Sequence, residues 1–359
     1  MYFNQGSWLL HDREAGLSDK WSLIPSRKAE SLQTERHPMQ AEVDGSATDW
    51  PVERTSLKTD REFMKVLSQA VPKVLEDLDI GPCKSLWNTS YLRSKIDPDR
   101  EIIVHKACNR NMNFQKKDFK YTTLPFSSFI QSVEKGDHLY LRSISAVSPN
   151  STPAHLAADF PEIADDFQLP GPLRFIRDNI HSSPLRISGQ VNMWLHYDIM
   201  ANVLFQIQGV KKMILFPPRD ISRLDFPPGS TTSRLDIFPD KGRPSTLAFT
   251  AGTSHFEALL KPGNALYIPP MWSHAGAPLP SSGANIAVNV FFRNLDTKSY
   301  AAGRDVYGNR DLSAYEDGRR DVEKIANRFT GKDVDIPREI ARVYLERLGH
   351  ELIGKAREL

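Results

Sequence analysis

The segment from Val191 to Phe292 consists of short apolar runs separated by Pro, Gly, Asp and Ser, and it shows little helical periodicity. Short strands broken by turn residues are typical of a β-sandwich or a β-barrel. Helical patterns flank this segment, with apolar residues at helical spacing from Phe63 to Leu78 and within Leu312–Phe329 and Pro337–Leu359. The sequence therefore predicts a mainly β protein with flanking helices, in which the β-structure is central and antiparallel.

Further elements are predicted before the β-rich segment. Glu101–His105 and His138–Ile144 have strand patterns, and Leu124–Gly136 places its apolar residues on one face of a helix. The stretch from His11 to Lys58 is polar, and such a composition buries too little apolar surface to order itself. We divide the chain into three parts: residues 1–58 as a strand and a flexible linker, residues 59–308 as one domain, and residues 309–359 as C-terminal helices.

Composition and charge narrow the class of protein. The formal net charge of the 359 residues is only +2, so no overall field favours nucleic acid. Two cysteines, Cys83 and Cys108, cannot form a disulfide framework and suit a reducing compartment. The opening MYFNQGSWLL lacks the basic start and apolar run of a signal peptide, and no apolar stretch has the length of a membrane span. We expect a cytoplasmic protein, or a nuclear one, without a membrane partner.

His196 and Asp198, at the start of HYDIMANVLFQIQGVKKMILFPP, suggest a metal site. If this stretch is a strand, residues i and i+2 project to the same face, so the imidazole and the carboxylate would lie together. With His274, in KPGNALYIPPMWSHAG, they would form the facial triad of non-haem iron(II) oxygenases. An isolated His-x-Asp is nevertheless common by chance, and His274 alone is consistent with an ordinary loop histidine.

Three polar residues near these positions strengthen the metal interpretation. Asn202 follows Asp198 closely, Lys211 begins the strand-like KKMILF, and Asn289 interrupts the apolar run NIAVNVFF. A cation or an amide in a buried strand costs free energy unless it has a partner. A dicarboxylate ligand in a pocket would provide that partner.

Three stretches together, HYDIMANVLFQIQGVKKMILFPPRD, PGNALYIPPMWSH and NIAVNVFF, resemble the JmjC/cupin-like family of iron(II)- and 2-oxoglutarate-dependent hydroxylases. The resemblance extends from about His138 to Asp311, and DVYGNRD (Asp305–Asp311) is similar to the tRNA wybutosine hydroxylases and related JmjC domains of that family. It implies a double-stranded β-helix, or cupin jelly roll. MYFNQGSW resembles the final strand of a kelch propeller blade, so we expect the chain to be the C-terminal part of a longer protein.

The resemblance also implies cofactors, roles for individual residues and a reaction. Fe(II) would be held by His196, Asp198 and His274, which would be the catalytic centre. The co-substrate 2-oxoglutarate would be held by polar side chains of the same domain, namely Tyr140, Asn202, Lys211 and Asn289. With O2, such an enzyme hydroxylates a substrate C–H bond, here on the wybutosine side chain of tRNA(Phe), or assists wybutosine biosynthesis. The substrate assignment depends on the resemblance alone.

Weaker signals concern partners. Arg110, Lys116, Lys117 and Lys120 form a basic cluster with interleaved aromatic residues, which fits a groove for RNA but also a solvated strand face. Trp272 would either shape the mouth of the pocket or pack in the core. The apolar stripe from Ile340 to Leu352 would either cover the domain's own core or pair with a second copy as a homodimer.

Two other functions remain open from the sequence. The same chemistry could act on a protein side chain, as in the asparaginyl or lysyl hydroxylases of the family. Alternatively, the domain could be a non-catalytic JmjC module that binds RNA or tethers neighbouring domains. An intact ligand triad argues against the non-catalytic module, and turnover with tRNA or with peptides would separate the two enzyme hypotheses.

Overall fold

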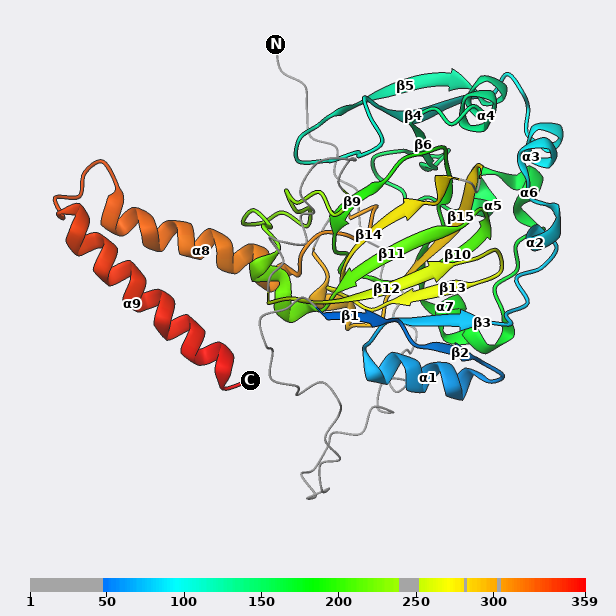
Figure 1. The fold of residues 1–359 in the computed structure, drawn as a ribbon. Coiled ribbons are helices and arrows are strands. Elements are labelled where there is room, and N and C mark those ends of the chain that lie inside the picture. The colour runs from blue at the N-terminus through cyan, green and yellow to red at the C-terminus, as the bar shows by residue number, and fades with distance from the viewer. Residues whose placement is uncertain (1–47, 239–251, 281–282, 302–304) are drawn as a thin grey trace, which may run out of the picture. The chain divides into compact units, whose positions relative to one another are not determined.

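The computed structural model describes residues 48–238, 252–280, 283–301 and 305–359. The strand predicted near the N-terminus and most of the predicted linker lie outside the described residues. One of its two β-sheets has the strand order β1-β12-β11-β14-β9 (Figure 1). The strands of this smaller sheet are β1 (Thr48–Pro51), β9 (Met193–His196), β11 (Lys211–Phe216), β12 (Ser254–Leu260) and β14 (Ser273–Pro278).

The larger sheet has the order β2-β3-β13-β10-β15-β8-β6-β4-β5, and β7 pairs with β15 beside this path. Most neighbouring strands in both sheets run antiparallel, whereas β1 and β2 pair in parallel with β12 and β3. The strands of this larger sheet are β2 (Arg54–Ser56), β3 (Lys73–Glu76), β4 (Glu101–Ala107), β5 (Phe119–Pro125), β6 (Leu139–Arg142), β7 (Ile180–Ser182), β8 (Leu185–Ser188), β10 (Ala201–Gln208), β13 (Ala265–Ile268) and β15 (Asn285–Phe292).

Strand β10 shows how the two sheets form the core. Val203 and Phe205 join a large apolar cluster with the helices, whereas Leu204 packs with Met213 and Leu215 of the smaller sheet. Because successive side chains of a strand alternate between its faces, β10 is covered on both sides, and apolar residues therefore occupy successive positions from Val203 to Phe205. The two facing sheets form a double-stranded β-helix, or jelly roll, which confirms the predicted fold class.

Helices cover the outer face of the larger sheet, where α1, α3, α4 and α7 contribute to the large apolar cluster (Figure 1). The capping box of Thr59 and Glu62 fixes the start of the first of them. The helices are α1 (Asp60–Gln69), α2 (Cys83–Leu86), α3 (Thr89–Lys95), α4 (Phe126–Glu134), α5 (Leu156–Asp159), α6 (Pro161–Ala164), α7 (Arg174–Asn179), α8 (Ser313–Thr330) and α9 (Arg338–Arg357), with 3₁₀ turns at Gly171–Leu173, Pro218–Arg223 and Thr297–Ser299.

The helix predicted from Phe63 to Leu78 is too long. The helix α1 ends at Gln69, Ala70 adopts a left-handed conformation, and the chain continues as β3. Val74 and Leu75 are both fully buried because β3 is covered on its two faces. A short continuous apolar run does not distinguish a buried strand from a helix, and here helical spacing continued across the turn by coincidence.

The predicted linker is also too long at its C-terminal end. The strands β1 and β2 occupy part of the stretch before Lys58 and join the two sheets. Backbone pairing with β12 and β3 orders this stretch, although its side chains are largely polar. Local composition does not reveal such pairing, because every residue has a backbone carbonyl that accepts a hydrogen bond, and every residue except proline has an N–H that donates one.

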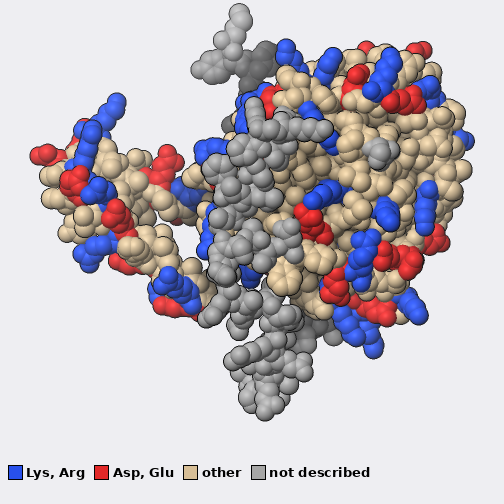
Figure 2. Space-filling model, viewed as in Figure 1, with Lys and Arg blue, Asp and Glu red and all other residues tan. Residues whose placement is uncertain are grey.

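The sequence predicts two C-terminal helices, and the structure has both, α8 and α9, which form a hairpin (Figure 1). The rings of Phe329 and Tyr344 stack between them with centroids 6.1 Å apart. Among the described residues, no helix combines the length and the apolar character needed to cross a bilayer. On the face seen in Figure 2, lysine and arginine side chains are interspersed with aspartate and glutamate, so this face has no large area of a single sign.

Candidate metal centre and adjoining pocket

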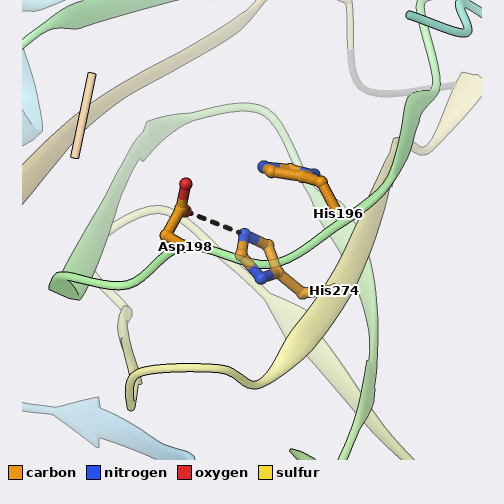
Figure 3. Close-up of side chains that lie close together, drawn as sticks. All are labelled: His196, Asp198 and His274. Atoms are coloured by element: carbon orange, nitrogen blue, oxygen red, sulfur yellow. Dashed lines mark ion pairs between the residues drawn. The ribbon is translucent and has the colours of Figure 1, made fainter. Parts of the chain in front are cut away.

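The strand pairing brings the two candidate histidines together. His196 is the last residue of β9, and it lies opposite His274 of β14 in the register of the smaller sheet. Asp198 lies just beyond β9, in the turn that leads into β10, so the prediction that it shares a strand with His196 is wrong in detail. The three side chains still converge (Figure 3), and their ligand atoms all lie within 4.8 Å of one another.

Hydrogen bonds fix the orientation of both imidazoles. His196 donates from Nδ1 to the carbonyl oxygen of Trp194 at 3.0 Å, and His274 donates from Nδ1 to that of Trp272 at 2.9 Å. Both rings therefore present an unprotonated Nε2, which is the atom that binds a metal. The Nε2 atom of His274 lies 3.6 Å from Oδ2 of Asp198 (Figure 3).

A loop from the C-terminal side holds the turn that carries Asp198. The backbone amides of Ile199 and Met200 both donate to the carbonyl oxygen of Gly308. Tyr197, which points away from the metal ligands, donates from its hydroxyl to Asp311 at 3.0 Å. Tyr197 is a positioning residue that sequence reasoning missed, because only its alternation with the ligands was visible.

Burial sets the charge states of the three candidate ligands. It lowers the pKa of His196 well below the usual value, and the neighbouring His274 lowers it further. Burial likewise lowers the pKa of His274, so both rings are neutral at physiological pH. The pKa of Asp198 is raised by burial, although His274 and two arginines oppose the rise. The Oδ2 atom of Asp198 has no hydrogen-bond partner among the described residues.

A pocket between the sheets adjoins the candidate ligands and contains the polar residues singled out in the sequence. Lys211, Asn202, Asn289 and Tyr140 all line it. The Asn289 side chain donates from Nδ2 to Oδ1 of Asn202 at 3.1 Å, and the Oδ1 atom of Asn289 has no partner among the described residues. The amide pair therefore offers one donor and one acceptor to a ligand in the pocket.

Lys211 is the most unusual residue of this pocket. Its side chain is 9% exposed, and it forms no ion pair with any carboxylate of the described residues. Burial, together with the charge of Arg186, lowers the pKa of its amine to about 7. The next residue, Lys212, lies half-exposed and pairs with Glu257 at 2.7 Å. The two adjacent lysines thus have opposite environments on the two faces of β11.

Two arginines near the ligands were not predicted from the sequence. Arg186 of β8 lines the pocket and donates to the hydroxyl of Tyr140. Arg142 of β6 lies directly opposite Arg186 in the sheet register. An arginine within a strand looks like a solvent-facing residue in the sequence, and only the pairing of β6 with β8 shows that both guanidinium groups face the interior.

The predicted basic cluster does not act as a unit. Arg110 donates to the side chain of Asn192 and to the carbonyl of Pro278, and Lys116 pairs with Asp236. Both therefore have partners within the protein, but Lys116 is exposed all the same, and RNA contact by either residue stays a prediction. Lys117 and Lys120 are exposed, so RNA contact by these two stays a prediction.

Aromatic residues near the basic cluster form a continuous packed group. Phe119 and Tyr121 pack around His105, and Phe114 lies against Trp194, which in turn lies 5.5 Å from the ring of His196. The Tyr121 side chain is 62% exposed. This group connects the metal ligand His196 with the surface.

Trp272 belongs to the core and not to the mouth of the pocket. It is 3% exposed, packs edge-on against Phe256, and donates from its indole to the carbonyl of Ala70 at 3.0 Å. Of the two roles that the sequence allows for Trp272, the structure therefore supports packing in the core. Its backbone carbonyl nevertheless serves the site by orienting His274.

Comparison with known proteins agrees with this arrangement. The model of the cupin-like domain family matches residues 59–298. The chain is 46% identical to tRNA wybutosine-synthesizing protein 4 of Aspergillus oryzae, over 99% of the chain and 34% of that protein. It is 34% identical to tRNA wybutosine-synthesizing protein 5 of Danio rerio, over 72% of the chain and 79% of that protein. The human protein of that name is 31% identical, over 85% of the chain and 96% of its own length.

These relatives differ in how much of them the chain covers. It spans about a third of the length of its Aspergillus relatives and nearly all of the human one. A match over almost the whole of a shorter relative shows that the described domain also exists with little else attached to it.

Proposed function

Because the chain belongs to the JmjC/cupin-like family and is related to the wybutosine-synthesizing proteins, we propose that it is an Fe(II)- and 2-oxoglutarate-dependent hydroxylase that acts on the wybutosine side chain of tRNA(Phe), or that assists wybutosine biosynthesis. One observation supports the chemistry: a buried lysine without an acidic partner among the described residues lies in the same pocket as a triad of two histidines and one aspartate. The triad implies a metal, and the lysine implies an anionic co-substrate.

The donor set fits Fe(II). Two neutral imidazoles and one carboxylate are the ligands of non-haem iron oxygenases, and they leave positions open for other ligands. The orphaned Oδ2 atom of Asp198 supports this assignment, because a buried carboxylate oxygen without a partner is costly. A cation held by His196, Asp198 and His274 would remove that cost and would hold the carboxylate in its charged form.

The pocket fits a dicarboxylate such as 2-oxoglutarate. A carboxylate that contacts the amine of Lys211 would restore its charge, which burial alone disfavours. The hydroxyl of Tyr140 and the amides of Asn202 and Asn289 line the same space and would complete the polar contacts. Leu204 and Met213, which line it as well, would keep water from the bound co-substrate.

Each group of residues then has a defined task. When bound, Fe(II) and 2-oxoglutarate supply the oxidising chemistry, in which O2 is consumed, 2-oxoglutarate becomes succinate and CO2, and a substrate C–H bond is hydroxylated. The protein holds the metal on three ligands of fixed orientation and anchors the co-substrate on Lys211. Residues 305–311 keep Asp198 in place, so we place the end of the catalytic part after Asp311, slightly beyond the predicted boundary.

The choice of tRNA as substrate depends on the relatives, which are named as wybutosine-synthesizing proteins of fungi and vertebrates. The exposed Lys117, Lys120 and Tyr121 beside the pocket are compatible with RNA, because they combine positive charge with an open aromatic ring. We also propose that the C-terminal hairpin pairs two copies of the chain.

The test is turnover with two classes of substrate. The purified chain is incubated with Fe(II) and 2-oxoglutarate, and with either wybutosine-containing tRNA or a peptide mixture. We expect succinate release that rises with the tRNA, and a wybutosine nucleoside heavier by one oxygen atom. His274→Ala should abolish both, whereas His350→Ala, an exposed histidine of α9, should change neither.

The other outcomes identify the alternatives. Peptide-dependent succinate release, with none from tRNA, would make the enzyme a protein hydroxylase. Binding of tRNA without succinate release, unchanged in His274→Ala, would indicate a non-catalytic module and contradict the proposal.

A further inference from the structure

Arg142 has a partly buried positive charge that the proposed chemistry does not use. It lies on β6, and its Nε atom is buried without a hydrogen-bond partner among the described residues. No carboxylate of the described residues forms an ion pair with it, Asp198 included. Burial and the neighbouring Arg186 lower the pKa of its guanidinium to about 10, which leaves it charged at physiological pH. A partly buried guanidinium without a carboxylate partner is unusual because it loses part of its hydration and gains no ion pair in return.

The position of Arg142 is next to the candidate metal centre. Its charge acts on both His196 and Asp198, opposing the rise that burial causes in the pKa of Asp198. Arg186 acts on the same two ligands and on Lys211 as well. Arg142 lies opposite Arg186 in the sheet register, and Arg186 lines the pocket that contains the candidate metal ligands, so Arg142 lies near them.

A second small cavity borders Arg142, and its lining has the character of an anion site. The ring of Tyr307 lies over the guanidinium, with 4.3 Å between the guanidinium carbon and the ring centroid. Ser182, which is 1% exposed, lines the same cavity, and its hydroxyl has no partner among the described residues. The cavity thus combines a positive charge and an unused hydroxyl beneath an aromatic ring that is about one-third exposed.

Two other arginines of this chain, Arg100 and Arg293, also lie over aromatic rings, but their guanidinium groups have protein partners or solvent. Arg100 lies over Phe160, but it also donates to the carbonyl of Asp159 and pairs with Glu162 at 3.6 Å. Arg293 lies over Tyr300 and is exposed to solvent. Each has either protein partners or water for its polar edge. Arg142 has a ring on one side, and its Nε atom is buried without a hydrogen-bond partner among the described residues.

Building on the proposed function, we propose that Arg142 and Ser182, beneath the ring of Tyr307, bind an oxyanion of the substrate beside the metal centre. The planar fork of a guanidinium matches a carboxylate or a phosphate, and the stacked ring holds its plane fixed. Such a subsite would orient one anionic group so that a neighbouring carbon faces the metal. It would also reject substrates without that anion, because they would leave the guanidinium unpaired.

The anion has two possible sources, a carboxylate within the modified side chain or a phosphate of the RNA backbone. Acetate and dimethyl phosphate serve as probes for these two sources. The whole chain is saturated with Mn(II) and N-oxalylglycine, so that the metal and co-substrate sites are filled, and each probe is titrated at constant ionic strength. The measurement is the rise of the melting temperature with probe concentration, from which an affinity follows.

We expect saturable stabilisation by one of the probes, and that probe identifies the source. Arg142→Gln should weaken its binding at least about tenfold, as expected for the loss of a charge-assisted contact. Arg142→Lys, which keeps the charge but loses the fork, should give an intermediate loss and serves if the Gln variant does not fold. Tyr307→Phe should bind as the unsubstituted chain does, whereas Tyr307→Ala should not. Arg293→Gln is the matched control and should have no effect.

Three results would contradict the proposed subsite. It fails if neither probe stabilises the chain, or if the probe affinity is the same in Arg142→Gln and Arg142→Lys as in the unsubstituted chain. It also fails if Arg293→Gln weakens binding as much. Since the titration needs no turnover, a chain that binds the probe through Arg142 but releases no succinate would contradict the hydroxylase proposal and leave the subsite standing.

Discussion

At the scale of single residues, Lys211 and Lys212 show how strongly the environment decides the role of a side chain. They are adjacent in β11 and chemically identical, but their side chains lie on opposite faces of the strand. Lys212 has water and Glu257, whereas Lys211 has neither solvent nor an acidic partner among the described residues. We therefore predict a functional role for Lys211 and none for Lys212.

Replacing each lysine by methionine tests this difference. Lys211→Met should weaken binding of N-oxalylglycine to the Mn(II)-loaded chain by about ten- to a hundredfold, because it removes a hydrogen bond to a charged group worth roughly 1.5–3 kcal/mol. Lys212→Met should change the affinity less than about twofold, since exposed pairs contribute little. Isothermal titration calorimetry measures both. Equal affinities in the two variants would remove Lys211 from the co-substrate site.

The pH dependence of the same binding gives a second prediction. The pKa of the Lys211 amine is lowered to about 7, and a carboxylate ligand binds its protonated form. Affinity for N-oxalylglycine should therefore be steady below pH 7 and fall as the pH rises above it, up to about tenfold per unit. Calorimetry from pH 6 to pH 9 checks this, with Lys211→Met as the control that should lose the slope. A flat profile in the unsubstituted chain would show that the amine stays charged without a ligand.

Whereas the affinity for N-oxalylglycine should fall as the pH rises, the contribution of Lys211 to the stability of the ligand-free protein should increase. Between about pH 7 and the ordinary pKa of lysine, the folded chain binds fewer protons at this amine than the unfolded chain does. The contribution of Lys211 to the free energy of unfolding therefore rises with pH over that window. Denaturant unfolding of the metal-free chain and of Lys211→Met isolates this contribution as the difference between the two pH profiles.

Sequence reasoning found some residues of the site and missed others for a physical reason. His196 and Asp198 are near neighbours, and Lys211 stands out because a cation begins an apolar strand. Arg142 and Arg186 carry no such local signal. Their side chains reach the interior through the pairing of β6 with β8, two strands separated by more than forty residues of chain. The register between these two strands is set by the pairing of the whole sheet, so no local stretch of sequence predicts it.

At the scale of elements, the turn between β10 and β11 controls where Lys211 lies. Gly209 has φ +78°, and a Cβ atom there would lie 2.5 Å from Nδ2 of Asn285. Gln206 and Asn285 hold this turn through hydrogen bonds to Gly209 and Val210. The turn thus has a fixed conformation that only glycine adopts without strain.

Gly209→Ala should therefore destabilise the protein by about 2 kcal/mol or more, through left-handed strain and the clash with Asn285. It should also weaken N-oxalylglycine binding, because the start of β11 moves. Gly283→Ala is the matched control: it has φ +65°, but no atom lies within 4 Å of the added Cβ, so only the strain of about 1 kcal/mol remains. Urea unfolding of both variants decides the point, and equal losses would mean that the packing against Asn285 is unimportant.

Element prediction succeeded where pattern and burial agreed. Strands such as β15 and helices such as α4 have the lengths and apolar patterns expected of them. The prediction failed at β3, where a strand covered on both faces looks like the continuation of α1. It failed again at β1 and β2, which are held by backbone pairing with distant strands and therefore leave little trace in side-chain composition.

At the scale of the whole molecule, the site is a product of topology. Strands from both sheets and the loop at residues 305–311 contribute to it, although these segments are far apart in the chain. A jelly roll brings them together because its two sheets face each other across the pocket. The family resemblance supplied this topology at the outset, since no single strand pattern in the sequence specifies which strands become neighbours.

The C-terminal hairpin has a surface that the rest of the described chain does not cover. Ile340, Val343, Tyr344 and Leu352 recur at helical spacing on α9, and each is about half-exposed. An apolar stripe of this kind on a helix normally packs against a partner. We therefore expect the chain to form a dimer through α8 and α9.

Replacing Val343 and Leu352 together by glutamate should convert that dimer to a monomer, because two charges at the interface would lose their hydration on pairing. The sedimentation velocity of the chain at micromolar concentration measures this, with Val147→Glu as the control, since Val147 is 78% exposed on a loop away from the hairpin. The double variant should keep its N-oxalylglycine affinity, because no residue of α9 lines the metal pocket. If the unsubstituted chain already sediments as a monomer, the stripe must instead contact another partner, and the dimer has to be abandoned.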